Sequence, residues 1–376
     1  MARIELIYFN AGGGHRAAAQ ALGQAMQHRP WQVHQTNLVD MLDTKGQFYK
    51  LLGWHPEDLY NRRLSSGMTL GMRQELKLLQ WMIRLANPAM IKKMQEYWVS
   101  ARPDLVVSLI PNFNRALCQS LSQAMPGTPF VTVLTDMADH PPNFWIEPDL
   151  PQHLVCGTTH AVEQALHAGC PAERIHRSSG MILSPRFYQS STIDRVQERL
   201  KHGLDPRQAV GLVMFGGYGS DVMKNIARSV PDTPLILICG KNAKLAQSLR
   251  RMPARAARLV IEFTDDVPYW MRLSDFLIGK PGPASLSEAV QMGLPVIVTK
   301  NAWTMPQERW NTQWVRTHGL GVVVPGFNRV QEAVAEVLDQ LPQLLANVAK
   351  IRNRAVFEVP EILKTLLPVT AVSDHQ

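Results

Sequence analysis

Short apolar runs alternate with helical patterns along this chain, and turns rich in glycine or polar residues follow many of them. In the first half, the runs are Ile4 to Phe9, Asp104 to Ile110, Phe130 to Leu134, His153 to Cys156 and Ile175 to Ser184. In the second half, they are Val210 to Phe215, Leu235 to Cys239, Leu259 to Phe263, Asp275 to Ile278, Pro295 to Val298 and Gly321 to Val324. Apolar strands joined by helices are typical of parallel sheets covered on both faces, so the pattern predicts an α/β fold.

The chain of 376 residues is too long for one typical hydrophobic core and suggests about two domains. Between Arg186 and Pro206 the apolar periodicity is lost, so we place the domain boundary near residues 190–205. The pattern predicts a first Rossmann-like domain at residues 1–190 and a second at 205–345. A C-terminal helical segment, broken by Pro360, is expected at 346–376.

A glycine turn joins the strand that ends at Ile278 to the next predicted helix. Gly282 lies between two prolines there, so the chain must turn sharply before a helix that ends at Gly293. Ser285 or Ser287 is expected to cap this helix. Free N–H groups at such a helix start bind anionic phosphate, although the same sequence also fits a plain helix-packing turn.

Two further glycine turns come directly after predicted strands. The first is Gly12-Gly13-Gly14-His15, and the second contains Gly216, Gly217 and Gly219. The first turn lacks the spacing of the dinucleotide fingerprint, and neither turn has the lysine of a Walker loop. The first turn therefore forms a glycine cradle in which His15 is either a base near neutral pH or simply a cap of the helix.

Carboxylates follow the strand that ends at Leu134. Asp136 comes two residues later, and Asp139-His140 precedes a pair of prolines. The C-terminal ends of parallel strands form the mouth of an α/β sheet, where ligands bind, so Asp136 rivals His15 as the general base. A structural carboxylate that caps the next turn is an equally open alternative.

Positive charge is concentrated in one part of the first domain. The chain has a net charge of +8 and a pI near 9.4, and residues 45–102 contain ten Lys or Arg against four acids. Aromatic residues and methionines are interleaved with these charges, and an apolar helical stripe consists of Leu76, Leu79, Ile83, Met90 and Met94. Such an insert can lie in an anionic lipid interface, or its stripe can belong to an ordinary core helix. No recognition-helix or RNA-binding pattern accompanies the charge, so no nucleic-acid partner is expected.

The cysteines and the hydropathy pattern bear on the compartment. Cys118, Cys156, Cys170 and Cys239 show no zinc-type spacing, so buried free thiols in a reducing cytoplasm are expected. The N-terminal apolar run is too short and too polar for a signal peptide. No segment approaches the roughly 18 uninterrupted apolar residues of a membrane span, so any membrane contact should be peripheral, at the inner face of the cell membrane.

Residues 277–311 as a whole resemble the motif that binds nucleotide-diphosphate sugars in the C-terminal domain of GT-B glycosyltransferases. The resemblance rests on the glycine turn, on Glu288, and on the Gln307-Glu308 pair followed by Asn311. It is greatest to the monogalactosyldiacylglycerol synthase branch and to the peptidoglycan lipid-linked glucosaminyltransferases. Similar elements elsewhere are Gly-Gly-Gly-His, Thr135-Asp136 before a His-Pro loop, and Cys239-Gly240-Lys241-Asn242.

The resemblance covers nearly the whole chain and implies two Rossmann-like domains that face each other across a cleft, with a C-terminal helix that returns to the first domain. The implied donor-binding residues are Gly216, Gly217, Gly219, Phe263, Lys280, Gly282, Pro283, Ala284, Ser285, Glu288, Gln307, Glu308 and Asn311. The implied acceptor-binding residues are Gly12, Gly13, Gly14, Arg16, His140 and Trp81, and His15 or Asp136 is the implied catalytic base. The chain departs from its relatives at Ile110, where they carry a histidine, and at Phe215 and Tyr218.

The function implied by the resemblance is inverting transfer of a hexose from a UDP-sugar to a lipid acceptor, with diacylglycerol as the expected lipid. No cofactor and no metal are expected, because helix-start amides and Lys280 would stabilise the leaving pyrophosphate. Two other functions stay open. One is a UDP-sugar 2-epimerase on the same fold, and the other is a non-catalytic UDP-sugar-binding protein at an anionic membrane surface.

Overall fold

The computed structural model describes residues 1–10, 14–42, 72–190 and 192–368. On the long helix that starts at Met72, side chains are described from Leu78 onward. The chain divides into two compact units. Of the described residues, those from Met1 to Pro185 and from Asn353 onward form the first unit, and those from Arg186 to Arg352 form the second. Residues 346–352 of the predicted C-terminal segment therefore fall in the second unit, and the rest of that segment falls in the first.

The first unit contains a six-stranded sheet with the strand order β2-β1-β3-β4-β5-β6, in which every neighbouring pair is parallel. The strands are β1 (Ala2–Tyr8), β2 (Trp31–Asn37), β3 (Leu105–Ser108), β4 (Phe130–Val133), β5 (Gln152–Cys156) and β6 (Ile175–Arg177). Strand β2 was not predicted, because an edge strand with mostly polar residues lacks the apolar run of the others. The predicted last strand is shorter than expected and ends at Arg177.

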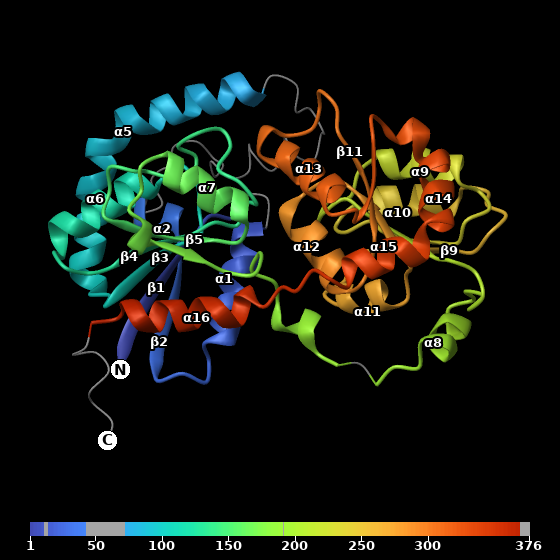
Figure 1. Cartoon of the computed structure of the whole chain (residues 1–376), viewed down its shortest axis with the longest axis horizontal. Coiled ribbons are helices and arrows are strands. Elements are labelled where there is room, and N and C mark those ends of the chain that lie inside the picture. The colour runs from blue at the N-terminus through green and yellow to red at the C-terminus, as the bar shows by residue number, and fades with distance from the viewer. Residues whose placement is uncertain (11–13, 43–71, 191, 369–376) are drawn as a thin grey trace. The chain divides into compact units, whose positions relative to one another are not determined.

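Helices cover both faces of this sheet (Figure 1). They are α1 (Gly14–Ala25), α2 (Leu38–Leu42), α5 (Met72–Ala101), α6 (Asn114–Ala124), α7 (Thr159–His167) and α16 (Ala355–Leu366). Helices α2, α5 and α6 pack on one face through Met94, Trp98 and Leu117. Helices α1 and α16 lie together against the other face. All four cysteines are buried and free, as predicted.

Helix α16 continues through Pro360, so the predicted break at this residue is wrong. The helix starts where Asn353 donates a hydrogen bond to the carbonyl oxygen of Met181 at 2.9 Å. Glu358 accepts a hydrogen bond from the backbone N–H of Ser179 at 2.7 Å. Tertiary packing of Val359 and Leu363, which are fully buried, outweighs the one backbone hydrogen bond that the proline removes.

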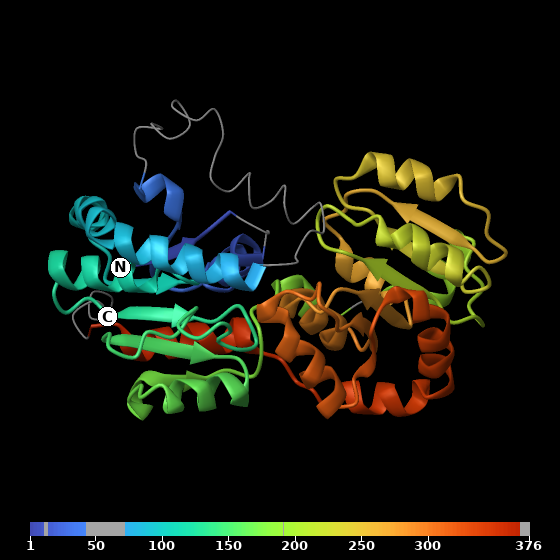
Figure 2. The same cartoon turned by 90° about the horizontal axis from the view of Figure 1, so that it is seen from above.

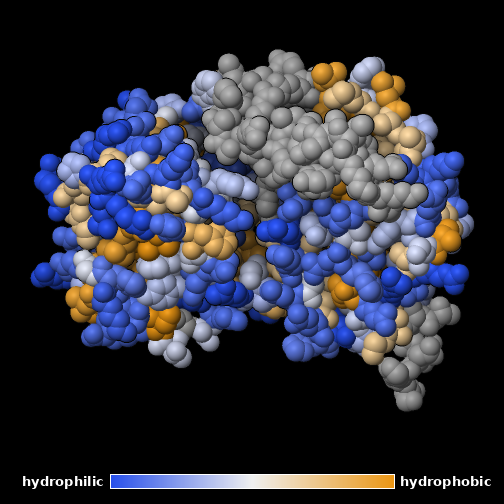
Figure 3. Space-filling view, turned by 180° about the vertical axis from the view of Figure 1, so that it is seen from behind, coloured by the Kyte–Doolittle hydropathy of each residue, from blue (hydrophilic) through white to orange (hydrophobic). Residues whose placement is uncertain are grey.

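Helix α5 has two different faces. Met94 is fully buried and Ile83 and Met90 are partly buried, so this part of the predicted stripe faces the core. Leu79 is exposed instead, and the side chain of Leu76 lies outside the described residues. Exposed apolar residues on the opposite face of the helix form a ridge that consists of Leu78, Trp81, Met82 and Leu85. This α5 ridge gives the hydrophobic colour over the outer side of the helix in Figure 3.

The second unit contains another six-stranded parallel sheet, with the order β12-β11-β10-β7-β8-β9. Its strands are β7 (Gly211–Met214), β8 (Leu235–Ile238), β9 (Arg258–Ile261), β10 (Phe276–Gly279), β11 (Val296–Thr299) and β12 (Gly321–Val324). All six were predicted to within about two residues. The chain reverses direction across the sheet after β9, and this switch places the ends of β7 and β10 side by side.

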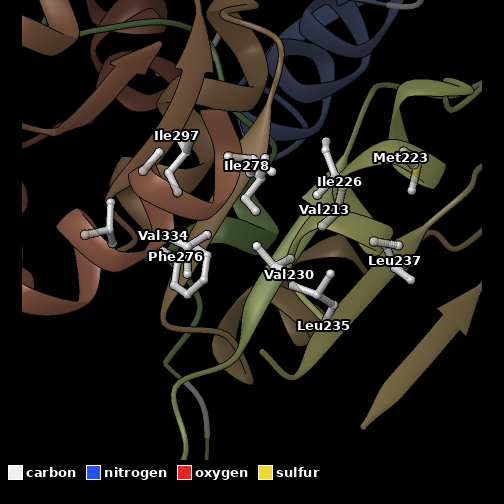
Figure 4. Packing of buried hydrophobic residues seen from close by; sticks show 14 of the residues in the cluster. Val213, Met223, Ile226, Val230, Leu235, Leu237, Phe276, Ile278, Ile297 and Val334 are labelled. Atoms are coloured by element: carbon white, nitrogen blue, oxygen red, sulfur yellow. The ribbon is translucent and has the colours of Figure 1, made fainter. Parts of the chain in front are cut away.

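Helices again cover both faces of the sheet (Figure 2). They are α8 (Arg195–Lys201), α9 (Val222–Ser229), α10 (Ala243–Arg250), α11 (Val267–Arg272), α12 (Pro283–Gln291), α13 (Arg309–Thr317), α14 (Val330–Asp339) and α15 (Leu341–Val348). The core on one face joins Phe276 and Ile278 of the sheet to Ile226 and Val334 of the helices. Figure 4 shows these side chains pointing toward one another. Short 3-10 helices span Ala172–Arg174, Pro185–Tyr188, Pro306–Glu308 and Phe327–Arg329.

The segment predicted as an irregular linker contains helix α8. Arg199 on this helix is buried and contacts Asp275 at 2.6 Å, and Arg195 contacts the same carboxylate at 2.6 Å. Both guanidinium groups also donate to backbone carbonyl groups of residues 272–274. The helix is short, buries the charged Arg199 and exposes Val196 and Leu200, so it lacks the apolar inner stripe by which the sequence pattern would indicate a helix.

Candidate active site

Helix α12 begins at a proline and has no capping side chain. Gly282 is the N-cap residue with φ −69° and ψ 140°, and residues other than glycine can adopt these backbone angles. The predicted caps Ser285 and Ser287 are wrong, because both lie inside the helix. Pro283 has no N–H, so Ala284 and Ser285 supply the first backbone donors of the helix. These amides, together with the positive end of the helix dipole, can bind an anionic group.

An ion pair lies over this helix start. The Nζ atom of Lys280 is 3.3 Å from Oε1 of Glu308, whose side chain is 5% exposed, against 40% for Lys280. A methyl group added at Gly282 would lie 3.4 Å from Oε1 of Glu308 and 3.5 Å from Cε of Lys280. The missing side chain of Gly282 therefore leaves space between the helix amides and the two charges. An anion in that space would meet the ammonium group and the amides together.

Gln307 and Asn311 are buried beside the same loop. The amide nitrogen of Asn311 donates to the carbonyl oxygen of Pro281 at 2.8 Å, so this residue holds the glycine turn in place. Among the described residues, Oε1 of Gln307 and Oδ1 of Asn311 have no hydrogen-bond partner. A buried acceptor without a partner costs about 1–3 kcal/mol, which a bound hydroxyl group could recover at Gln307.

Glu288 lies one turn into helix α12 and is partly buried. Burial raises the pKa of this carboxyl group from 4.5 to about 7. The group therefore changes charge close to neutral pH, unlike an exposed glutamate. Both of its protonation states are present under physiological conditions.

The glycine turn after β7 packs against the end of β8. Gly216 and Gly219 have φ angles of +72° and +60°, which other residues rarely adopt. The backbone N–H of Lys241 donates to the carbonyl oxygen of Gly217 at 2.9 Å. Phe263, which follows β9, is 55% exposed, and Nζ of Lys241 lies 5.6 Å from its ring centre. The donor residues predicted in the second unit thus lie at the C-terminal ends of β7, β9, β10 and β11 or in the segments that follow these strands.

His15 in the first unit lies in the first turn of α1 and is partly buried. Its Nδ1 atom is 3.0 Å from the hydroxyl oxygen of Thr135, which directly precedes Asp136. Burial lowers the pKa of His15 from 6.5 to about 4, although a hydrogen bond to the backbone of Leu109 acts in the opposite direction. The imidazole is therefore neutral at physiological pH. Burial is the main cause of this pKa shift.

Trp145 connects His15 with Asp136. Its indole nitrogen donates to Oδ2 of Asp136 at 3.0 Å, and its ring centre lies 5.9 Å from that of His15. The two residues predicted as rival bases therefore belong to one cluster. Trp145 is fully buried, and sequence reasoning missed it. The only signal was its place in the apolar run Phe144-Trp145-Ile146 that follows the His-Pro loop.

The remaining predicted acceptor residues that the structure describes lie in the loop after Asp136, on α1 and on α5. Asp139 accepts hydrogen bonds from the backbone N–H groups of residues 143, 144 and 145, so it shapes the loop that carries Trp145. His140 is partly exposed next to it, and Arg16 is exposed on α1. Trp81 is 58% exposed on the α5 ridge. Gly12 and Gly13, and residues 45–71 of the basic insert, lie outside the described residues, whereas Gly14 starts α1.

Solved structures define the class of this fold. MurG from Acinetobacter baumannii matches with a TM-score of 0.63 at 12% identity, over 97% of this chain and 100% of that one. A UDP-GlcNAc 2-epimerase from Neisseria meningitidis, solved with UDP-GlcNAc, matches with a TM-score of 0.60 at 14% identity, over 97% and 99% of the two chains. The fold is the GT-B fold of glycosyltransferases, as predicted, and enzymes of another type share it.

Sequence comparisons show which members of this class the chain is similar to. A family model described as monogalactosyldiacylglycerol (MGDG) synthase matches residues 15–178. The processive diacylglycerol beta-glucosyltransferase of Bacillus subtilis is 24% identical, over 86% of this chain and 81% of its own length. A probable chloroplastic monogalactosyldiacylglycerol synthase of Glycine max is 24% identical, over 97% of this chain and 71% of its own length. The predicted resemblance and the predicted enzyme class, a hexosyltransferase, are confirmed.

Proposed function

We propose that this chain transfers a hexose from a UDP-sugar to the hydroxyl group of diacylglycerol, with inversion at the anomeric carbon. The observation that carries the proposal is the start of α12, where free amides, Lys280 and Glu308 surround the space in front of Gly282. The names of the relatives support diacylglycerol as the acceptor. We infer the UDP-sugar donor and the inversion at the anomeric carbon from the site residues and from the resemblance.

The donor would bind through its phosphates and its sugar at once. The amides of Ala284 and Ser285 and the ammonium group of Lys280 would hold the pyrophosphate. Glu308 and Gln307 would accept hydrogen bonds from sugar hydroxyl groups, and Glu288 would accept them from the ribose. The Lys280–Glu308 ion pair would then fix the separation between the phosphate and the hexose.

In the reaction, the acceptor oxygen would form a bond to the anomeric carbon while the bond from that carbon to the phosphate oxygen breaks. UDP leaves with the bonding electrons, and its charge is stabilised by the amides and Lys280. The acceptor proton passes to a base. A single displacement of this kind inverts the anomeric configuration.

The base would come from the cluster around Trp145. His15 is neutral at physiological pH, but a pKa of about 4 makes it a weak proton acceptor there. Asp136 accepts a hydrogen bond from the indole N–H of Trp145 at its Oδ2 atom. Separate kinetic measurements on His15→Gln and Asp136→Asn distinguish the two, because replacement of the base lowers kcat, whereas replacement of an acceptor-orienting residue mainly raises KM for the lipid.

The acceptor would be reached from an anionic membrane surface on the cytoplasmic side. The α5 ridge exposes Leu78, Trp81, Met82 and Leu85, and Arg84 and Lys92 are exposed on the same helix. Apolar residues with basic residues at their margin are typical of helices that lie in a lipid interface. Among the helices described, none is long and apolar enough to cross a bilayer.

A donor and acceptor screen tests the proposal. The protein is incubated with UDP-glucose, UDP-galactose or UDP-N-acetylglucosamine, with vesicles that contain or lack diacylglycerol. Release of UDP that depends on diacylglycerol, with a new β-linked glycolipid formed from the α-linked donor, supports it. Isomerisation of the donor without lipid would instead indicate an epimerase. Binding of the donor with neither reaction would indicate a non-catalytic UDP-sugar-binding protein.

A further inference from the structure

A rigid turn follows strand β11 in the second unit. The backbone N–H of Asn301 donates to the hydroxyl oxygen of Thr304 at 2.9 Å. The N–H of Thr304 returns a bond to the carbonyl oxygen of Asn301 at 3.1 Å. The N–H of Trp303 donates to Oδ1 of Asn301 at 2.8 Å. Three bonds within four residues hold the backbone of this turn in one conformation.

The turn is also fixed to its surroundings. The side-chain amide of Asn301 donates to the carbonyl oxygen of Pro325 at 2.9 Å, which ties the turn to the end of β12. The hydroxyl group of Thr304 donates to the carbonyl oxygen of Thr299 at 3.3 Å, and Nε of Arg309 donates to the carbonyl oxygen of Thr304 at 3.3 Å. The turn is therefore anchored on two sides, unlike a loose surface loop.

This anchored turn exposes a tryptophan. Trp303 is 52% exposed, whereas the next two residues, Thr304 and Met305, are buried. An indole has a large apolar surface, and its exposure loses the stabilisation that burial would bring. A rigid backbone that presents an exposed aromatic ring suits contact with a ligand.

The position of the turn relates it to the proposed donor site. Strands β10 and β11 are neighbours in register, with Leu277 opposite Val296, so their C-terminal ends lie at the same edge of the sheet. Lys280 and Gly282 follow β10, and the anchored turn follows β11. Glu308, four residues after Thr304, forms the ion pair with Lys280. The turn that carries Trp303 therefore follows the same edge of the sheet as Lys280 and Gly282, and Glu308 comes five residues after Trp303 in the sequence.

We propose that the indole of Trp303 packs against the apolar C–H face of the donor hexose, an inference that rests on the proposed function. A pyranose ring has hydroxyl groups around its edge and C–H groups on its faces. Gln307 and Glu308 can accept hydrogen bonds from the hydroxyl groups at the edge of the pyranose, and a flat aromatic ring can pack against its C–H face. Trp303 then recognises the sugar and not the nucleotide.

Calorimetry with UDP and with UDP-hexoses tests this assignment. In Trp303→Ala, the affinity for UDP-glucose or UDP-galactose should fall about five- to tenfold, because one aromatic contact is lost. The affinity for UDP alone should stay within about twofold. Trp303→Phe keeps a flat ring and should retain most of the affinity. Leu338→Ala, which removes an exposed apolar side chain from α14, is the matched control and should change neither affinity.

Other outcomes would overturn the assignment. Equal weakening of UDP and UDP-hexose would place the indole at the nucleotide. Unchanged donor affinity with a raised KM for diacylglycerol would make Trp303 a lipid contact. If the wild-type protein bound neither UDP nor UDP-hexose, the proposed function would fail, and the assignment would fail with it. Because the variants are compared only after wild-type binding is measured, the two failures are distinguishable.

Discussion

At the residue scale, the proposed donor site depends on the missing side chain of Gly282. Gly282 has ordinary backbone angles, so the turn itself does not require glycine at this position. The space in which its side chain would lie is bounded by Lys280 and Glu308. A glycine that the backbone does not require, in front of free helix amides, is most simply explained by the close approach of a ligand.

Replacement of Gly282 by alanine should separate binding from stability. The added methyl group would occupy the space in front of the amides, so the affinity for a UDP-sugar should fall roughly tenfold or more. The free energy of unfolding should be unchanged or rise by up to about 1 kcal/mol, because alanine accepts these backbone angles. Calorimetry and thermal unfolding measure the two quantities. Gly326→Ala is the control, since its methyl group meets only the Asn328 side chain. Normal donor affinity in Gly282→Ala would contradict the phosphate site.

Glu288 should make donor binding depend on pH. Its pKa is about 7, so the carboxylate that would accept hydrogen bonds from the ribose forms as the pH rises through 7. The affinity for UDP should therefore increase between about pH 6 and 8 in the wild type. Glu288→Gln should remove this dependence, whereas His15→Gln should keep it. An unchanged pH profile in Glu288→Gln would exclude Glu288 from the donor site.

Glu288 and His15 should make stability depend on pH in opposite directions. Folding raises the pKa of Glu288, so its contribution is present below its unfolded pKa of 4.5 and is lost as the pH rises through about 7. Folding lowers the pKa of His15, so the unfolded state binds its proton more tightly, and stability is lost as the pH falls from 6.5 through about 4. Denaturant unfolding of Glu288→Gln and His15→Gln at several pH values measures each contribution.

At the element scale, helix α5 combines two roles on opposite faces. Met94 and Trp98 face the core, and the indole nitrogen of Trp98 donates to the hydroxyl oxygen of Ser120 at 2.8 Å. Tyr97 donates to the buried carboxylate of Glu5 on β1 at 2.7 Å, which fixes the helix on the sheet. The α5 ridge is therefore held on a firmly packed helix.

Removal of apolar side chains from the α5 ridge should weaken membrane binding without unfolding the protein. Trp81→Ala and Leu85→Ala should each reduce partitioning onto anionic vesicles about tenfold or more, because each side chain would contribute roughly 1.5–3 kcal/mol of apolar burial. The melting temperature should not change, since both residues are exposed. Flotation with phosphatidylglycerol vesicles measures the partitioning, and Leu338→Ala on α14 is the control. Equal flotation of all variants would exclude the ridge as the membrane contact.

The elements that sequence reasoning missed have a common feature. Strand β2 and helix α8 are stabilised by partners far away in the sequence rather than by a local apolar pattern. Strand β2 pairs along its whole length with β1, and α8 is held by the Arg195 and Arg199 contacts with Asp275. The buried strands were found because their own residues carry the signal.

At the scale of the whole molecule, the chain returns to its first unit after completing the second. Helix α16 buries Val356, Val359 and Leu363 in the first unit, although these residues follow the second unit in the sequence. A hydrogen bond from Asn353 to Met181 and one from Ser179 to Glu358 fix the point of return. The first unit is therefore incomplete without the last residues of the chain.

Substitution in α16 should destabilise the first unit. Leu363→Ala leaves a cavity in a fully buried position and should lower its free energy of unfolding by about 2–5 kcal/mol. Lys364→Ala, next to it on the exposed side, should change this value by no more than about 0.5 kcal/mol. Chemical denaturation followed by tryptophan fluorescence measures both. A loss as small in Leu363→Ala as in the control would mean that α16 is not part of the core.

The sequence by itself determined the two parallel sheets, most of their strands and the two glycine turns of the second unit, because these depend on local apolar runs and on glycine. It also indicated a candidate donor motif at residues 277–311, since that motif is continuous in the sequence. Only the tertiary structure decided that His15, Asp136 and Trp145 form one cluster, that Lys280 pairs with Glu308, and that Gly282 caps α12. Burial, which sets the pKa values of His15 and Glu288, depends on what the whole fold packs around a side chain and cannot be read from neighbouring residues.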